Sequence, residues 1–261
     1  MIMGTAEFYD AMAEHYHLIF DDWEASMGRQ GAALDFVLRE ECGPGALKVL
    51  DCSCGIGTQA IAMARCGHRV TGSDVSGGAI ERARREAGQR GLKMDFFVSD
   101  MTSLNEVPER GFDVVATLDN ALPHLSPEEL CAAAKAMRGK LRDGGILMAT
   151  IRDYDELAVR KPPIQTPSFH GREGERRIVH QVWDWIDSEK YVVHLYITVE
   201  KQGRWEVHHF AGVYRALKRA ELVKALEDAG FGQVRWRMPE ESGGRTRGPG
   251  LYLPLVTARA E

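Results

Sequence analysis

The fold is decided by ten residues, VLDCSCGIGT at positions 49–58. An apolar strand pattern ends at the carboxylate of Asp51, and the loop that follows contains Gly55 and Gly57. Glycines at such a strand end let the backbone turn tightly and approach a ligand. The spelling Gly55-x-Gly57-x-x-Ala60 also fits a dinucleotide fingerprint, so the glycines alone leave the ligand open.

Strand and helix patterns alternate on both sides of this loop. Strands are predicted at 48–51, 69–74, 94–98, 112–118 and 146–151, with helices between them at 59–65, 77–90 and 127–142. Helical spacing covers residues 5–42, and the chain closes with a helix at 220–229 and strands at 233–238 and 252–258. This alternation favours an α/β fold with a Rossmann-like, doubly wound, mostly parallel sheet.

The segment after residue 152 breaks the alternation. Prolines at 162, 163 and 167 predict a loop, and three β-rich runs follow at 178–186, 191–200 and 205–214. The short turns between these runs predict a three-stranded antiparallel insertion.

Composition excludes several classes of protein. The 261 residues are 44% hydrophobic and 27% charged, which is enough apolar material for a sizeable core, and the net charge of -5 argues against a nucleic-acid or anionic-lipid partner. No apolar run reaches the roughly 18 residues of a membrane span, and residues 1–10 lack the layout of a signal peptide. Five cysteines without a paired C-x-x-C motif predict free thiols, no metal site and a cytoplasmic protein.

Two more carboxylates mark the ends of predicted strands. Asp74 ends the second strand, where a carboxylate can accept from both ribose hydroxyls of a nucleoside. Asp100 follows the third strand and precedes Met101, so it can accept from an adenine amine beside an apolar wall. The carboxyl ends of parallel strands meet at one crevice, and we therefore expect these acids to face the same ligand.

This combination resembles the class I S-adenosylmethionine-dependent methyltransferases. The segments LDNALPHL at 118–125 and IRDYD at 151–155 are similar to those of glycine/sarcosine N-methyltransferases. The segment YHLIF at 16–20, with Trp23 and Arg29 downstream, is similar to the lid helix of that group. Related bacterial enzymes methylate nitrogens of natural products, including the azapteridine toxoflavin. The resemblance implies S-adenosyl-L-methionine as cofactor, S-adenosyl-L-homocysteine as product and a small-molecule acceptor.

The resemblance also implies which residues bind the cofactor. In that family an arginine of the lid meets the cofactor carboxylate, and Arg29 is the candidate here, although it could be a solvated helix charge. Tyr16 and Trp23 would equally suit the core of the helical segment, and His124 the start of a helix. The predicted cofactor-binding residues are Tyr16, Trp23, Arg29, Asp51, Cys52, Gly55, Gly57, Asp74, Val75, Asp100, Met101, Leu118 and His124.

The residues predicted to act on the acceptor are Asp119, Asn120, Arg152 and Tyr214. Arg152 can clamp a carboxylate, as the matching arginine does in glycine-type enzymes, or it can pair with Asp153 or Asp155 and fix the loop. Asp119 stands where the glycine-methylating group commonly has a small residue. It can take a proton from an acceptor nitrogen, or it can cap the following turn.

The expected organisation is a helical lid at 1–45, a core at 46–152 and 215–261, and an insertion at 153–214 over the acceptor site. Trp183 and Trp185 share one strand face, which would pack against a helix or subunit or stack on a flat acceptor. The glycine-rich loop at 240–250 is either a flap or a surface loop. The insertion suits a lid and the dimer surface of a homo-oligomer equally well.

The predicted reaction is in-line methyl transfer to a nitrogen of a small molecule, either an amino-acid-like amine or a natural-product heterocycle. Two alternatives stay open. The protein could be an O- or C-methyltransferase of secondary metabolism, or a non-catalytic protein that binds S-adenosylmethionine.

Overall fold

Strands on both sides of the glycine loop build a seven-stranded sheet in the order β10-β11-β5-β4-β1-β2-β3. The computed structural model describes residues 2–239 and 252–261. The strands are β1 (Lys48–Asp51), β2 (Arg69–Asp74), β3 (Asp95–Val98), β4 (Phe112–Thr117), β5 (Leu141–Thr150), β10 (Phe231–Arg237) and β11 (Leu255–Ala260). The five strands β5, β4, β1, β2 and β3 pair in parallel, and β11 runs antiparallel to both β5 and β10. The predicted Rossmann-like, mostly parallel sheet is confirmed.

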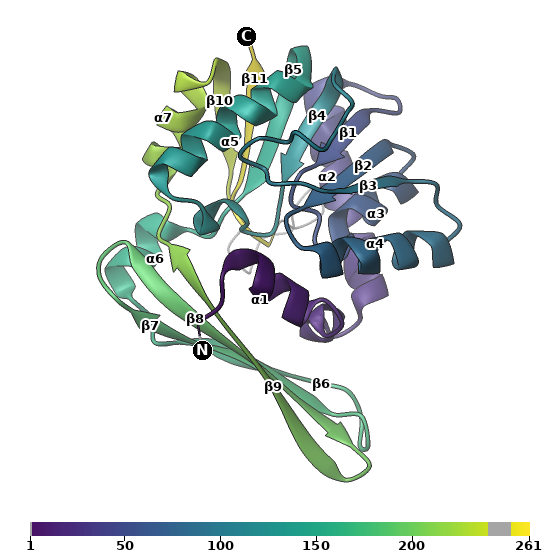
Figure 1. Cartoon of the computed structure of the whole chain (residues 1–261), viewed down its shortest axis with the longest axis vertical. Helices are drawn as coiled ribbons and strands as arrows, with labels where there is room; N and C mark the ends of the chain where they lie inside the picture. The colour runs from purple at the N-terminus through teal and green to yellow at the C-terminus, as the bar shows by residue number, and fades with distance from the viewer. Residues whose placement is uncertain (1, 240–251) are drawn as a thin grey trace.

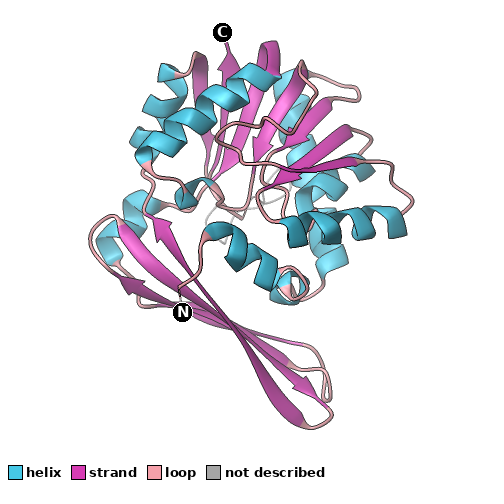
Figure 2. Cartoon of the chain, viewed as in Figure 1, coloured by secondary structure: helices cyan, strands magenta, loops and turns pink. Residues whose placement is uncertain are grey.

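Helices cover both faces of this sheet (Figure 1, Figure 2). Val49 and Val114 point to the face that packs with helices α2 (Trp23–Cys42), α3 (Thr58–Arg65) and α4 (Gly77–Gln89). Their neighbours Leu50 and Val115 point to the opposite face, which packs with α5 (Pro127–Lys140) and α7 (Arg219–Asp228). Successive side chains of a strand alternate between faces, so strands that are apolar throughout need a helical layer on each side.

The carboxyl ends of β1, β2 and β4 lie at one edge of the sheet. The chain runs from β1 to β2 on one side of β1, and β4 lies on the other side. Open α/β sheets bind ligands at such a reversal of strand order.

A second sheet, in the order β6-β7-β8-β9, corrects the predicted three-stranded insertion to four strands. Its strands are β6 (Ile164–His170), β7 (Arg177–Trp185), β8 (Lys190–Lys201) and β9 (Arg204–Arg215). Pro162 and Pro163 lie in the predicted loop, whereas Pro167 lies in the additional strand β6. An edge strand tolerates proline, and the register with β7 shifts between Gln165 and Ser168, where the proline lies.

The N-terminal helices lie between the two sheets (Figure 1). They are α1 (Thr5–Met12) and the 3-10 helix η1 (Tyr16–Ile19). Phe8 and Met12 of α1 are buried against Leu195, Ile197 and Phe210 of the second sheet. The second sheet therefore holds α1 in front of the carboxyl ends of the first sheet.

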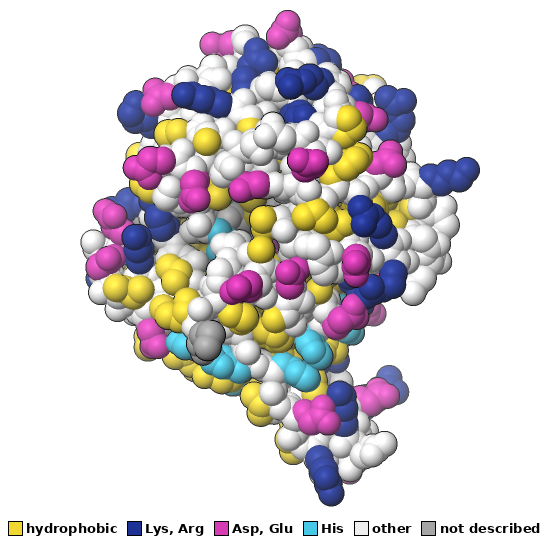
Figure 3. Space-filling model, in the orientation of Figure 1, with side chains coloured by type: hydrophobic (Ala, Val, Ile, Leu, Met, Phe, Trp, Pro, Cys, Tyr) yellow, Lys and Arg dark blue, Asp and Glu magenta, His cyan; other side chains and the backbone are white. Residues whose placement is uncertain are grey.

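On the face in Figure 3, acidic side chains are spread over the middle, and most basic ones lie at the top and toward the edges. Within residues 2–239 and 252–261, none of the helices is long and apolar enough to cross a membrane. The glycine-rich loop predicted at 240–250 lies outside the described residues.

Candidate functional site

The glycine loop leaves β1 and turns into α3 in the predicted way. Gly55 and Gly57 have φ angles of +52° and +93°. A Cβ atom on Gly57 would lie 2.8 Å from Ile61 Cδ1, whereas nothing lies within 4 Å of the equivalent position on Gly55. Gly57 is therefore required for the turn, and Gly55 leaves its backbone open to a ligand.

Asp74, at the end of β2, supports this loop from the neighbouring strand. Its Oδ2 accepts a hydrogen bond from Gly55 N at 2.8 Å, and its Oδ1 accepts from Ser76 N at 3.0 Å. The residue is 9% exposed, and burial raises the pKa of its carboxyl group. Each oxygen keeps a further lone pair for a ligand hydroxyl.

Asp51 lies beneath the loop and is fully buried. Its Oδ1 accepts from Ser53 N at 3.4 Å, and its Oδ2 has no hydrogen-bond partner among the described residues. Burial raises the pKa of Asp51 to about 7. A cationic amine beside this oxygen would supply the missing partner and favour the ionised carboxylate.

A cavity of about 220 Å³, here called the glycine-loop cavity, lies above this loop. Asp100 and Met101 line it after the end of β3, and Thr5 and Tyr9 line it from α1. Asp100 is exposed and accepts a hydrogen bond from Thr102 N at 2.8 Å. The predicted cofactor-binding residues in its wall are Tyr16, Cys52, Gly55, Asp74, Val75, Asp100, Met101, Leu118 and His124.

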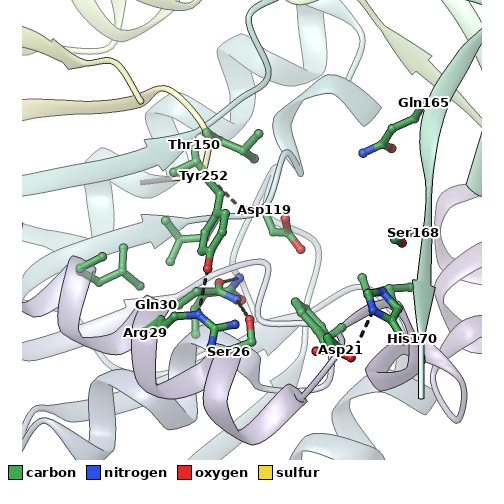
Figure 4. A pocket seen from close by; sticks show the side chains of 17 residues that line it. Asp21, Ser26, Arg29, Gln30, Asp119, Thr150, Gln165, Ser168, His170 and Tyr252 are labelled. Carbon is green, nitrogen blue, oxygen red and sulfur yellow. Dashed lines mark hydrogen bonds and ion pairs between the residues drawn. The ribbon is translucent and has the colours of Figure 1, made fainter. Parts of the chain in front are cut away.

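A second cavity of about 450 Å³, the β6 cavity, lies between α2, the ends of β4 and β5, and β6. Gln165 and Ser168 on β6 lie across it from Asp119 and Tyr252 (Figure 4). Arg29 lines this cavity, and its Nε donates to the Tyr252 hydroxyl at 3.0 Å. The residues that line both cavities are Gln59, Leu118 and Asp119.

Asp119 reaches the junction of the two cavities through a left-handed turn. Asp119 and Asn120 have φ angles of +54° and +66°, a region in which aspartate and asparagine are, after glycine, the residues most often found. Asp119 N donates to Thr150 Oγ1 at 2.8 Å, and the Tyr16 hydroxyl donates to Asp119 Oδ2 at 2.5 Å. These bonds hold the carboxylate where the two cavities meet.

Asn120 is only 5% exposed, and both ends of its amide are engaged. Its Oδ1 accepts from Arg152 N at 2.9 Å, and its Nδ2 donates to the Tyr154 hydroxyl at 2.9 Å. The Tyr154 hydroxyl in turn lies 2.9 Å from that of Tyr191 on β8. Asn120 thus links the ends of β4 and β5, while neither cavity includes it in its wall.

The guanidinium of Arg152 lies over the Trp183 ring, 4.7 Å from its centroid. Its Nη2 donates to Gln181 Oε1 at 3.4 Å. Gln181 pairs across the strands with Gln165 of the β6 cavity, so the two side chains share a sheet face. Arg152 therefore contacts the cross-strand neighbour of Gln165, although it is outside the cavity wall itself.

The alternative ion pair of Arg152 does not form. Asp155 Oδ2 lies 2.8 Å from Arg219 Nε, and Asp153 Oδ2 lies 3.7 Å from Arg219 Nη1. Within the described ranges, Arg152 forms no salt bridge. Its positive charge is thus available to an anionic group.

Tyr214 belongs to an aromatic cluster beside the glycine-loop cavity. The Tyr9 hydroxyl lies 3.0 Å from His124 Nε2 and 3.3 Å from the Tyr214 hydroxyl. Burial lowers the pKa of His124 to about 4 and raises the pKa of Tyr214 to about 12. Both side chains are therefore neutral at neutral pH, and His124 is a poor proton acceptor there.

Three residues predicted to bind cofactor lie outside both cavity walls: Trp23, Asp51 and Gly57. Trp23 Nε1 donates to Thr58 Oγ1 at 2.9 Å, and Arg82 and Arg90 lie over its ring.

Trp183 of the insertion is 5% exposed, and its ring packs against Tyr191. Nothing in the sequence pointed to Tyr9, Gln165 or Ser168, because their places depend on contacts distant in the chain.

Comparison with known proteins gives one family and several relatives. Residues 49–145 match the model of a methyltransferase domain. The glycine/sarcosine N-methyltransferase of Parasynechococcus marenigrum is 33% identical over 137 residues, which are 52% of this chain and 48% of that protein. The ubiquinone biosynthesis O-methyltransferase of Actinobacillus pleuropneumoniae is 33% identical over 122 residues, 44% of this chain and 49% of that protein. The chain thus spans about half the length of these curated relatives.

The fold has close counterparts among solved structures. An amino pentose methyltransferase from Micromonospora echinaspora, solved with bound S-adenosylmethionine, superposes with a TM-score of 0.70 at 19% identity and covers 95% of each chain. At this identity the likeness concerns the fold. Residues 49–145 thus match a methyltransferase domain, in agreement with the resemblance to class I S-adenosylmethionine-dependent methyltransferases seen in the sequence.

Proposed function

We propose that this protein transfers a methyl group from S-adenosylmethionine to a nitrogen atom of a small molecule. The observation that carries this proposal is the meeting of the two cavities at Gln59, Leu118 and Asp119. Methyl transfer by in-line displacement requires donor and acceptor to face each other with water excluded. Two cavities that share one wall suit this requirement, and a relative named as an N-methyltransferase supports the choice of nitrogen.

The residues around the glycine-loop cavity fit the cofactor. Asp74 and Asp100 offer carboxylates to ribose hydroxyls and the adenine amine, whereas Asp51 is buried behind the cavity wall and supports the loop by accepting from Ser53 N. Arg29 lines the neighbouring β6 cavity, from which its guanidinium can meet the carboxylate of the methionine part. When bound, S-adenosylmethionine supplies a methyl group activated by a sulfonium. The chain's own contribution is to hold the cofactor, to align its methyl group with the acceptor and to exclude water from both.

On the acceptor side, we assign two charged residues, Asp119 and Arg152, to groups of opposite charge on the acceptor. The Asp119 carboxylate can hold an acceptor ammonium and take its proton, and Tyr16 fixes the carboxylate by its hydrogen bond. Arg152 can pair with an anionic or carbonyl group. Gln165 and Ser168 add neutral hydrogen-bonding groups from β6. We infer an amine that also carries polar or anionic groups. Asn120 then acts as a positioning residue.

The wider organisation is part of the same proposal. We assign residues 1–45 to a lid, 46–152 and 215–261 to the core, and 153–214 to an insertion beside the acceptor. The cysteines at 42, 52, 54, 66 and 131 are free, which supports a cytoplasmic location.

O-methyl transfer is the second candidate, because one relative is named as an O-methyltransferase. A hydroxyl acceptor needs a base, and Asp119 is the carboxylate that both cavities share. A non-catalytic role is disfavoured by the volume of about 450 Å³ in the β6 cavity, since bulky side chains do not fill it.

Calorimetry followed by product analysis tests the proposal. S-adenosylmethionine and S-adenosylhomocysteine are titrated first, and micromolar binding is expected. The protein is then incubated with S-adenosylmethionine and a panel of glycine, sarcosine, an amino sugar, a flat azaheterocycle and a catechol. A mass gain of one methyl on an amine supports the proposal. Methylation of the catechol alone would select O-transfer, and no cofactor binding would refute methyl transfer altogether.

A further inference from the structure

Helix α1 lies across the glycine-loop cavity and is fastened at three places. Thr5 and Tyr9 form part of the cavity wall. At its start, Met3 N donates to Ala211 O at 3.1 Å and bridges to Gly212 of β9. In the middle, the Tyr9 hydroxyl lies 3.0 Å from His124 Nε2. A ligand that enters or leaves this cavity on the α1 side must displace the helix.

The third fastening is a carboxylate at the start of α4. Asp10 Oδ1 accepts from Ser76 Oγ at 2.6 Å and from Gly78 N at 2.9 Å. Ser76 is the N-cap of α4, and its Oγ also accepts from Ala79 N at 3.0 Å. A carboxylate bonded to the first turn of a helix gains from charge-assisted hydrogen bonds and from the helix dipole.

The approach of α1 to α4 depends on a glycine. A Cβ atom on Gly78 would lie 3.2 Å from Asp10 Oδ1 and 3.4 Å from Asp10 Cα. The first distance is tighter than ordinary contact and the second lies at its lower limit, so a side chain here requires Asp10 to shift by a few tenths of an ångström. Ser76, Gly78 and Asp10 thus form a direct contact between α1 and α4.

We infer that Asp10, Ser76 and Gly78 form a latch that controls cofactor exchange, with Asp10 as its positioning residue. The inference rests on the proposed function, because it assumes that the glycine-loop cavity holds the cofactor. None of the three residues lines that cavity. The latch therefore contributes almost equally whether the cavity is filled or empty, and it acts on the rate of exchange more than on affinity.

The latch also contacts one predicted cofactor-binding residue, Asp74. Ser76 N donates to Asp74 Oδ1 at 3.0 Å, while Ser76 Oγ donates to Asp10. One residue thus holds both the predicted ribose-binding carboxylate and the lid. Release of Asp10 frees α1 without removing the bond between Ser76 and Asp74, which makes the two effects separable by mutation.

The test measures dissociation of radiolabelled S-adenosylhomocysteine, chased with excess unlabelled compound and followed by rapid filtration. Asp10→Ala removes two charge-assisted hydrogen bonds, and we expect dissociation at least about tenfold faster, with association not slowed. Asp10→Asn keeps an acceptor oxygen, so its dissociation rate should lie between those of the wild type and Asp10→Ala. Gly78→Ala should also accelerate dissociation, although alanine favours the helix and should not lower the melting temperature.

The matched control is Glu81→Ala, which removes an equal charge from an exposed position on α4, the helix that Asp10 contacts. Glu81 makes no hydrogen bond among the residues described, and its variant should dissociate at the wild-type rate. Unchanged dissociation in both Asp10→Ala and Gly78→Ala would overturn the latch. So would slower association in Asp10→Ala, since that marks a damaged binding site. Failure of the wild-type protein to bind S-adenosylhomocysteine would instead refute the proposed function.

Discussion

Replacement of Asp74 by alanine should weaken cofactor binding more than any other single change at a strand end. The carboxylate is 9% exposed, and each oxygen can accept one cofactor hydroxyl besides its backbone bond. A hydrogen bond to a buried charged group contributes about 1.5–3 kcal/mol. Two such bonds total about 3 kcal/mol at the lower limit, which raises Kd about a hundredfold or more. Asp100 is exposed, and its replacement should cost about tenfold at most.

Calorimetric titration of S-adenosylhomocysteine into wild type, Asp74→Ala and Asp100→Ala measures both effects. Asp74→Ala also leaves Gly55 N and Ser76 N without their acceptor, so thermal unfolding must first establish that each variant is folded. A Kd within threefold of wild type for a folded Asp74→Ala protein would refute the assignment. An equal loss in the two variants would refute the reasoning from burial.

Three further outcomes are expected. Arg152→Ala should raise KM for the acceptor found in the product screen about tenfold while the Kd of S-adenosylhomocysteine stays constant, and equal loss of both would mean that Arg152 only fixes its loop. Burial raises the pKa of Asp51 from 3.8 to about 7, so the folded state loses stability as pH rises through this range. In urea unfolding, the difference in unfolding free energy between Asp51→Asn and wild type should therefore shift in favour of the variant by about 2 kcal/mol from pH 5 to pH 8. A difference that does not change with pH would contradict this. Tyr154→Phe should lower the unfolding free energy by about 1–3 kcal/mol because Asn120 Nδ2 loses its buried acceptor, whereas Tyr191→Phe keeps that bond and should cost less.

The parts of the fold that follow local rules could be predicted from the sequence. Asp51 and Asp74 end β1 and β2 at the predicted residues, because an apolar run that stops at a carboxylate and a glycine loop has few other interpretations. The cluster around the glycine loop follows from topology, since parallel strands bring their carboxyl ends to one edge.

Contacts between distant segments could not be predicted. Pro167 and the exposed residues around it lack the alternation of a half-buried strand, so β6 gave no strand pattern. The environment of Arg152 depends on Arg219, which lies far along the chain and takes both neighbouring aspartates. Asn120 was expected to act on the acceptor, but its left-handed backbone turns its amide toward Tyr154.

The position of β6 has a consequence for how such proteins diversify. Gln165 and Ser168 face the β6 cavity from an edge strand that pairs only with β7 within the described sheet. Substitutions on an exposed edge cost little stability, and none of them disturbs the glycine loop on the other sheet. With the β6 cavity assigned to the acceptor as proposed, substitutions in this one short strand would change the acceptor while leaving the glycine loop unchanged.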